Sequence, residues 1–176
     1  TSRCRVPCRA WLEVDAAHHL LHRDRLGREL RLAALLALDP DPTGPPVRGV
    51  ITLAAPMDLT GRTTLREKAI LYTYLGAYYD DAPDIYRNAS PITYVSANAP
   101  PWLIMHGTRD SVVPPMQAEE MARALEAVKV PVTLVRLVGA SHAFPATTSP
   151  AGRALDSAML AFLARWSSAS VQAMPL

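Results

Sequence analysis

The stretch that decides the fold is PPWLIMHGTRDSVVPPMQAEEMARAL, residues 100–125. It opens with a short apolar run, Trp102–Met105, which is followed by a polar loop that contains two prolines, Pro114 and Pro115. From Met116 to Lys129 the apolar residues recur at helical spacing on one face, and charged residues occupy the other. The stretch therefore predicts a buried strand, a loop and an amphipathic helix.

The same alternation continues on both sides of this stretch. Branched apolar residues predict a strand over Val132–Val138 and another over Val47–Ala54. A final helix is predicted over Gly152–Ser167, where apolar side chains again follow helical spacing. Short strands that alternate with helices of crossover length indicate an α/β fold, with a mostly parallel sheet flanked by helices on both faces.

The remaining segments are less regular. Residues 59–96 are polar and rich in tyrosine, and we expect few strands there, one helix over Leu65–Leu75 and a loop around YDDAPDIYRNASP. Near the start, the spacing predicts a helix over Ala10–His22 and a second one within LGRELRLAALLAL, residues 26–38. The proline-rich segment DPDPTGPP, residues 39–46, must end that second helix.

Length and composition bound the function. A chain of 176 residues fits one domain, and with 49% hydrophobic residues and a net charge of +2 it has neither the composition of a disordered chain nor that of a nucleic-acid-binding protein. No apolar run is long enough to span a membrane, no signal peptide is visible, and a cytoplasmic location is favoured. The first residue is not Met, so we expect the chain to start inside a longer protein. Cys4 and Cys8 are interpreted as free thiols.

Two loops carry the residues best suited to catalysis. HGTRDSVVP leaves the strand at Trp102–Met105, and GASHAF leaves the strand at Val132–Val138. The right-handed crossover rule makes these strands neighbours, so their loops should meet at the carboxyl edge of the sheet, where ligands bind in such folds. Asp110 and His142 are therefore candidates for a carboxylate and imidazole pair, which forms the acid and base of a Ser/His/Asp triad.

On these motifs the chain resembles the C-terminal part of the α/β hydrolases. The resemblance is closest to the bacterial esterase and lipase branch that includes feruloyl and acetyl-xylan esterase-like proteins and small carboxylesterases. It rests on residues 100–125, on VRLVGASHAF, and on YLGAYYDDAPDIYRNASPITYVSANAPP, which is similar to the segment before the acid's strand. It implies a single incomplete hydrolase domain over residues 1–176, with N-terminal strands missing and a cap-like or irregular insertion over about 59–96.

The resemblance also assigns roles. The family order is Ser, Asp, His, so Asp110 corresponds to the triad acid and His142 to the base. The nucleophile should lie on a tight turn with the pattern Trp-Gly-Glu-Ser-Ala-Gly-Gly-His before the helix LAALLAL, but here RELR, residues 28–31, stands in its place. Ser90 and Ser141 are disfavoured as substitutes because neither lies in such a turn, and His106 and Gly107 are expected to shape a turn rather than an oxyanion hole.

A one-base shift of reading frame would explain the gap. If Leu26–Arg31 were encoded by the codons CTG GGG CGA GAG CTC CGG, reading one base later would give TGG GGC GAG AGC TCC GG, which encodes Trp-Gly-Glu-Ser-Ser-Gly. Deletion and divergence are the alternative explanations, and the genomic DNA across these codons distinguishes the three.

Three functions stay open. The chain is an inactive fragment or disrupted copy of a serine esterase for small acyl esters, a non-catalytic binding module of the same fold, or the C-terminal part of a prolyl-oligopeptidase-type peptidase. No cofactor or metal is expected, although His18, His22 and Asp15 would share one face of the helix expected at 10–22. Tyrosines 72, 74, 78 and 79 would either line a substrate pocket or pack together. If the sheet has only three strands, the apolar edge at Val47–Ala54 would favour self-association.

Overall fold

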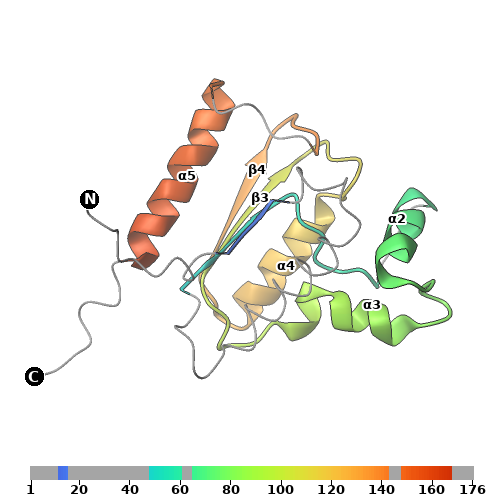
Figure 1. Cartoon of the computed structure of the whole chain (residues 1–176). Helices are drawn as coiled ribbons and strands as arrows, with labels where there is room; N and C mark the ends of the chain where they lie inside the picture. The colour runs from blue at the N-terminus through green and yellow to red at the C-terminus, as the bar shows by residue number, and fades with distance from the viewer. Residues whose placement is uncertain (1–11, 16–47, 61–64, 143–147, 168–176) are drawn as a thin grey trace, which may run out of the picture.

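The described part of the chain is built on a parallel sheet. The computed structural model describes residues 12–15, 48–60, 65–142 and 148–167 (Figure 1). Four strands lie in the order β1-β2-β3-β4. Their bounds are Leu12–Asp15 for β1, Val50–Leu53 for β2, Trp102–Gly107 for β3 and Val132–Leu137 for β4. Every neighbouring pair is parallel, which confirms the predicted α/β class.

The register brings the ends of β3 and β4 together. Trp102 pairs with Val132, and the ladder continues without a break to Gly107 opposite Leu137. β3 is buried along its whole length, whereas β4 is only partly buried, as an outer strand of the described sheet should be. The polar loops that follow β3 and β4 consequently leave the same edge of the sheet side by side.

Helices cover both faces of this sheet (Figure 1). α4, Met116–Ala127, packs on one face in a core with Val50, Trp102 and Ile104. α5, Pro150–Ser167, covers the other face, where it buries residues such as Leu155 and Phe162 against alternate positions of β2 and β3. Alternation of side chains along each strand is what divides the apolar residues between the two cores.

The segment between β2 and β3 contains helices rather than strands in its described residues. α2, Leu65–Leu75, has the predicted bounds. The loop expected around YDDAPDIYRNASP is wrong for Pro83–Ala89, which forms helix α3, because a proline at the first helical position starts a helix instead of breaking it. A 3-10 turn, Pro91–Tyr94, follows. The tyrosines pack on one another: the rings of Tyr72 and Tyr78 stack with centroids 4.4 Å apart, and Tyr79 contacts Tyr86 edge-on at 5.4 Å. The expectation of aromatic packing is therefore confirmed for these pairs.

Two expectations about the N-terminal part are wrong. Leu12–Asp15 forms strand β1 instead of part of a helix, because these residues pair with Val50–Leu53 along their whole length. For the same reason β2 is an inner strand with partners on both sides, so it does not leave the apolar edge expected at Val47–Ala54. Self-association through a sheet edge stays a prediction, which now concerns β1 or β4.

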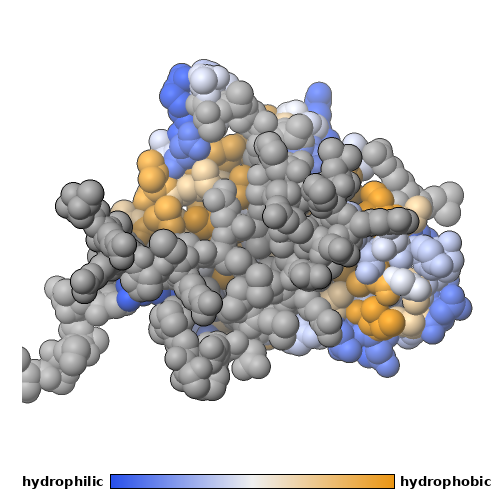
Figure 2. Space-filling model, in the orientation of Figure 1, coloured by the Kyte–Doolittle hydropathy of each residue, from blue (hydrophilic) through white to orange (hydrophobic). Residues whose placement is uncertain are grey.

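The described surface mixes polar and apolar regions. Hydrophobic residues are visible along α5 and around α2 and α3, beside hydrophilic patches (Figure 2). Leu160 on α5 and Ile85 on α3 are among the exposed apolar residues. None of the helices in the described ranges is both long enough and apolar enough to span a membrane.

Candidate active site

The loops that follow β3 and β4 are joined by backbone hydrogen bonds. The Thr108 N–H donates to the Leu137 carbonyl at 3.0 Å, and the Arg109 N–H donates to the Ala140 carbonyl at 2.9 Å. In the other direction, the Gly139 N–H donates to the Thr108 hydroxyl oxygen at 2.9 Å. These bonds extend the pairing of β3 with β4 beyond the sheet, and they hold the loop of His142 against the loop of Asp110.

Gly107 permits this close approach. A Cβ atom at this position would lie 2.5 Å from the Ala140 carbonyl oxygen and 2.6 Å from that of Ser141. Contacts below 3.0 Å between a Cβ and backbone atoms require the backbone to move. Glycine is therefore required at the end of β3, because only a residue without a side chain lets the two loops touch.

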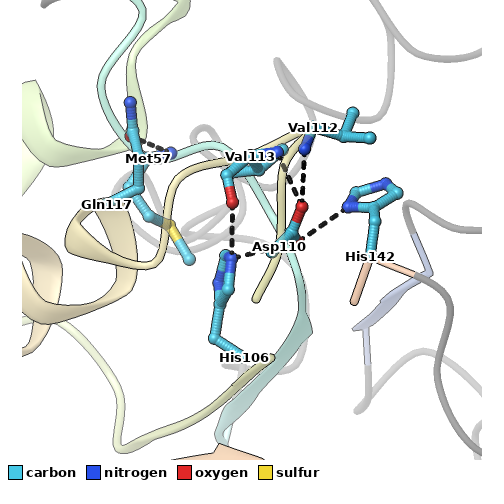
Figure 3. A network of polar contacts seen from close by, with 7 residues as sticks. All are labelled: Met57, His106, Asp110, Val112, Val113, Gln117 and His142. Atoms are coloured by element: carbon cyan, nitrogen blue, oxygen red, sulfur yellow. Dashed lines mark hydrogen bonds and ion pairs between the residues drawn. The ribbon is translucent and has the colours of Figure 1, made fainter. Parts of the chain in front are cut away.

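The structure brings Asp110 and His142 together. His142 Nδ1 lies 2.9 Å from Asp110 Oδ2 (Figure 3). The Asp110 side chain is fully buried, and that of His142 is 13% exposed. The other carboxylate oxygen, Asp110 Oδ1, accepts the N–H groups of Val112 and Val113, each at 2.9 Å. Turns of this kind, in which an aspartate side chain binds the backbone two and three residues later, fix the carboxylate rigidly.

This geometry assigns the protons. An ionised carboxylate only accepts hydrogen bonds, so the nitrogen of His142 that faces it must be the protonated one. In neutral His142 the Nε2 atom then carries the free lone pair, which can take up a proton from a nearby hydroxyl or water. The imidazolium that results is stabilised by the buried charge of Asp110.

His106 contacts the same carboxylate from below (Figure 3). Its Nε2 atom lies 3.2 Å from Asp110 Oδ2 and 3.0 Å from the carbonyl oxygen of Val113. Its ring is almost fully buried, at 2% exposure. The expectation that His106 shapes the turn agrees with the contact to Val113, but the contact to Asp110 was not anticipated.

Gln117, in the first turn of α4, holds the loop that follows β2. Its Oε1 atom accepts the N–H groups of Met57, at 2.9 Å, and Asp58, at 2.6 Å. Its Nε2 atom donates to the Asp58 carbonyl oxygen at 2.8 Å. One side chain thus satisfies three backbone groups, which ties the carboxyl end of β2 to the helix that follows the acid's loop (Figure 3).

The serines considered as nucleophiles differ in their surroundings. Ser90 is completely buried, where its hydroxyl donates to the Tyr86 carbonyl and accepts the N–H of Leu59. Both bonds give it a structural role at the end of α3. Ser141 is exposed and adjoins His142 in the chain. The stretch Leu26–Arg31, where the nucleophile is expected, lies outside the described residues, as do His18 and His22. The described ranges contain no group of three potential metal ligands.

Comparison with known proteins gives related esterases. The BD-FAE family model matches residues 39–125. Esterase LipQ of Mycobacterium tuberculosis is 32% identical over 142 residues, which are 75% of this chain and 34% of LipQ. Esterase LipC of the same organism is 42% identical over 81 residues, which are 43% of this chain and 20% of LipC. The chain thus spans about a third or less of the length of these relatives.

Solved structures of esterases share the fold. A truncated carbohydrate esterase from gut microbiota superposes with a TM-score of 0.64 and 20% identity, over 80% of this chain and 57% of that one. Esterase Est2 of Thermogutta terrifontis superposes with a TM-score of 0.58 and 21% identity, over 83% of this chain and 55% of Est2. The chain therefore has the fold of these esterases. Its relatives in sequence are esterases too, as the sequence motifs predicted.

Three supports of this site were missed from the sequence. The Thr108 hydroxyl, the amide of Gln117 and the contact of His106 with Asp110 each depend on residues brought together by the folded loops. One signal was available for His106. A histidine at the end of a fully apolar strand must be buried, and a buried imidazole needs a hydrogen-bond partner nearby.

Proposed function

We propose that this chain is the acid and base part of a hydrolase of the serine-esterase type, with Asp110 as the acid and His142 as the base. The observation that carries the proposal is the 2.9 Å contact of a fully buried carboxylate with a partly exposed imidazole. In this arrangement the charge of Asp110 is sheltered from water, and the free Nε2 of His142 is left for the reaction.

The chemistry follows from that proton assignment. His142 Nε2 takes the proton of a serine hydroxyl while the serine oxygen attacks the ester carbonyl carbon. The same proton then passes to the alkoxy oxygen as the carbon–oxygen bond to the alcohol breaks, which leaves an acyl-enzyme. Water gives its proton to Nε2 as it attacks the acyl-enzyme, and that proton returns to the serine oxygen when the acid leaves.

The substrate class proposed is small acyl esters. The support comes from the relatives, since LipC and LipQ are both esterases and LipM is a probable carboxylic ester hydrolase. None of these relatives is a peptidase, which favours ester hydrolysis over the prolyl-oligopeptidase alternative. Because this chain spans only part of each relative, the substrate is assigned to an intact hydrolase that contains these residues.

The chain as given is proposed to be inactive. Leu26–Arg31 contains no serine, and the nearest serines in the chain are Ser2 and Ser90. Without a nucleophile beside Nε2, the pair can bind or release a proton but cannot form an acyl-enzyme. This loss makes a non-catalytic binding role the competing function.

A repaired elbow tests the proposal. The variant carries Leu26→Trp, Arg28→Glu, Glu29→Ser, Leu30→Ser and Arg31→Gly, and it is assayed with p-nitrophenyl acetate and butyrate and with a fluorophosphonate that labels activated serines. We expect labelling and turnover in this variant, none in the chain as given, and loss of both when His142→Ala is added. A control without Glu29→Ser but with the other four changes should stay unlabelled.

Two results would contradict the proposal. Turnover by the unaltered chain that disappears with His142→Ala would show a nucleophile elsewhere. Labelling of the repaired variant that persists after His142→Ala and Asp110→Asn would show that the pair does not activate the serine.

A further inference from the structure

His106 is a buried histidine that lies beneath the acid. It is the last but one residue of β3, and its side chain lies on the same face as those of Trp102 and Ile104, toward α4. At 2% exposure the ring is out of contact with solvent, so it cannot meet a substrate directly. Any role in the reaction must therefore act through a neighbour.

The contacts of Nε2 fix the tautomer of this ring. Both neighbours of Nε2, the Val113 carbonyl oxygen and Asp110 Oδ2, are acceptors. An unprotonated Nε2 would set its lone pair against both oxygens, so this nitrogen carries the proton, which it donates to the Val113 carbonyl while Asp110 Oδ2 lies 3.2 Å away. Within the described part of the chain, the buried Nδ1 has no hydrogen-bond partner, which favours the neutral ring over an imidazolium with a second, unpaired N–H.

Asp110 Oδ2 consequently lies against two imidazole nitrogens. His142 Nδ1 donates to it at 2.9 Å from the loop after β4, and His106 Nε2 lies 3.2 Å from it within β3. The other oxygen, Oδ1, accepts the two backbone N–H groups of Val112 and Val113. Of these neighbours, only His106 is part of the sheet, and its ring also binds the carbonyl of Val113 at the far end of the turn.

We propose that His106 is a positioning residue for the acid: its Nε2–H binds the Val113 carbonyl and lies against Asp110 Oδ2, and so holds the turn with Oδ2 at the point where His142 Nδ1–H binds. The inference rests on the proposed function, since it concerns the acid of that pair. Because the ring is neutral, His106 supplies a hydrogen bond without a competing positive charge, and the full charge of Asp110 stays available to an imidazolium at His142. A residue that only filled space at this position would need no N–H.

The test uses NMR to measure the resonance of the His142 Nδ1–H proton in the whole chain. A strong bond to a carboxylate moves this resonance downfield and slows its exchange with water. We expect Asp110→Asn to abolish both effects. His106→Phe, which keeps a ring without a donor, should move the resonance upfield and speed its exchange about tenfold, the equivalent of roughly one hydrogen bond. His106→Leu is measured beside it, so that the outcome does not depend on the folding of one variant.

Two matched variants separate positioning from stability. His106→Gln retains an N–H donor and should restore most of the wild-type signal. Ile104→Val weakens the core on the same strand and the same face, and it should lower the melting temperature while the resonance stays unchanged. In an Asp110→Asn background, His106→Phe should have no further effect on the proton.

The outcomes distinguish the two proposals. If His106→Phe and His106→Leu fold and leave the His142 resonance and its exchange as in the wild type, His106 only fills space and the inference is overturned. If Asp110→Asn leaves them unchanged, the pair itself is not coupled and the proposed acid and base roles fail. A signal lost equally in His106→Gln and His106→Phe would assign the effect to ring shape and also overturn the inference.

Discussion

Gly107 lies so close to Ala140 that a Cβ on the glycine would stand 2.5 Å from the Ala140 carbonyl oxygen. That carbonyl accepts the N–H of Arg109, one of the bonds that join the two loops of the site. The same two residues therefore set both the contact and the limit of approach between the loops. This backbone contact therefore limits how far apart the loops that carry Asp110 and His142 lie.

Gly107→Ala should separate the loops. The added methyl group meets backbone atoms, which cannot rotate away, and we expect a loss of about 1 to 3 kcal/mol in the free energy of unfolding, typical of overpacking. The His142 Nδ1–H resonance should also lose its protection as Asp110 and His142 move apart. Urea unfolding and proton NMR measure the two effects.

Gly76→Ala is the control for that substitution. Gly76 has a φ of 78° and nothing within 4 Å of a Cβ, so alanine there is strained by its backbone conformation alone. We expect a loss of about 1 to 2 kcal/mol with the His142 proton unaffected. A Gly107→Ala protein with the same His142 signal as Gly76→Ala would contradict the role given to the close approach.

Thr108→Val tests a weaker link between the same loops. The variant removes the hydroxyl that accepts the Gly139 N–H but keeps the shape of the side chain. Since this bond is exposed, water can replace the lost acceptor, and the cost should be below about 1 kcal/mol. The His142 Nδ1–H proton should stay protected from exchange with water, and the exchange rates of this proton and of the backbone amides would check this. A loss as large as that of Gly107→Ala would mean that the hydroxyl, and not the glycine, sets the loop distance.

Much of this site was predictable because topology determines it. Two strands joined by one helix become parallel neighbours, so Asp110 and His142 had to leave the same edge of the sheet. The bounds of α2 and α4 also followed closely from helical spacing, since their ends coincide with changes from apolar periodicity to loop residues. These features depend on residue patterns within short segments of the sequence.

The wrong expectations about the N-terminal segment have a physical cause as well. The segment Leu12–Asp15 has apolar residues at helical spacing within a longer run, but four residues that pair with β2 form a strand whatever their wider spacing. The spacing of apolar residues within one segment does not show whether a strand elsewhere in the chain needs a partner. In the same way, the roles of Gly107 and Gln117 come from backbone groups of distant loops, whose positions no spacing along the chain reveals.

Gln117→Ala should destabilise the loop after β2. The substitution leaves the N–H groups of Met57 and Asp58 without their acceptor, and Met57 is buried. We expect a loss of about 1 to 3 kcal/mol, because unpaired backbone donors in a buried site are costly. Gln117→Glu keeps the accepting oxygen and adds a negative charge at the first turn of α4, so it should cost less. Chemical unfolding compares the two, and equal losses would refute the role of Oε1.

Tyr86 gives a pH-dependent prediction for the helical segment. The residue is buried beside Leu59 and Leu71, and its hydroxyl donates to the Ala77 carbonyl at 2.8 Å. Burial, together with nearby Tyr78 and Asp80, raises the pKa of Tyr86 above its ordinary value of 10.0. In the unfolded chain the phenol ionises near pH 10, so over the interval between that value and the raised pKa the folded state holds more protons.

The free energy of unfolding should therefore fall as the pH rises above about 10. Tyr86→Phe has no proton to lose at this site, so its stability should decline less steeply over the same interval, although at pH 8 it should be less stable than the wild type by about 0.5 to 1.5 kcal/mol for the lost hydrogen bond. Urea midpoints at pH 8 and pH 10.5 for the two proteins give the comparison. Parallel declines would mean that Tyr86 ionises as readily in the folded chain as in the unfolded one.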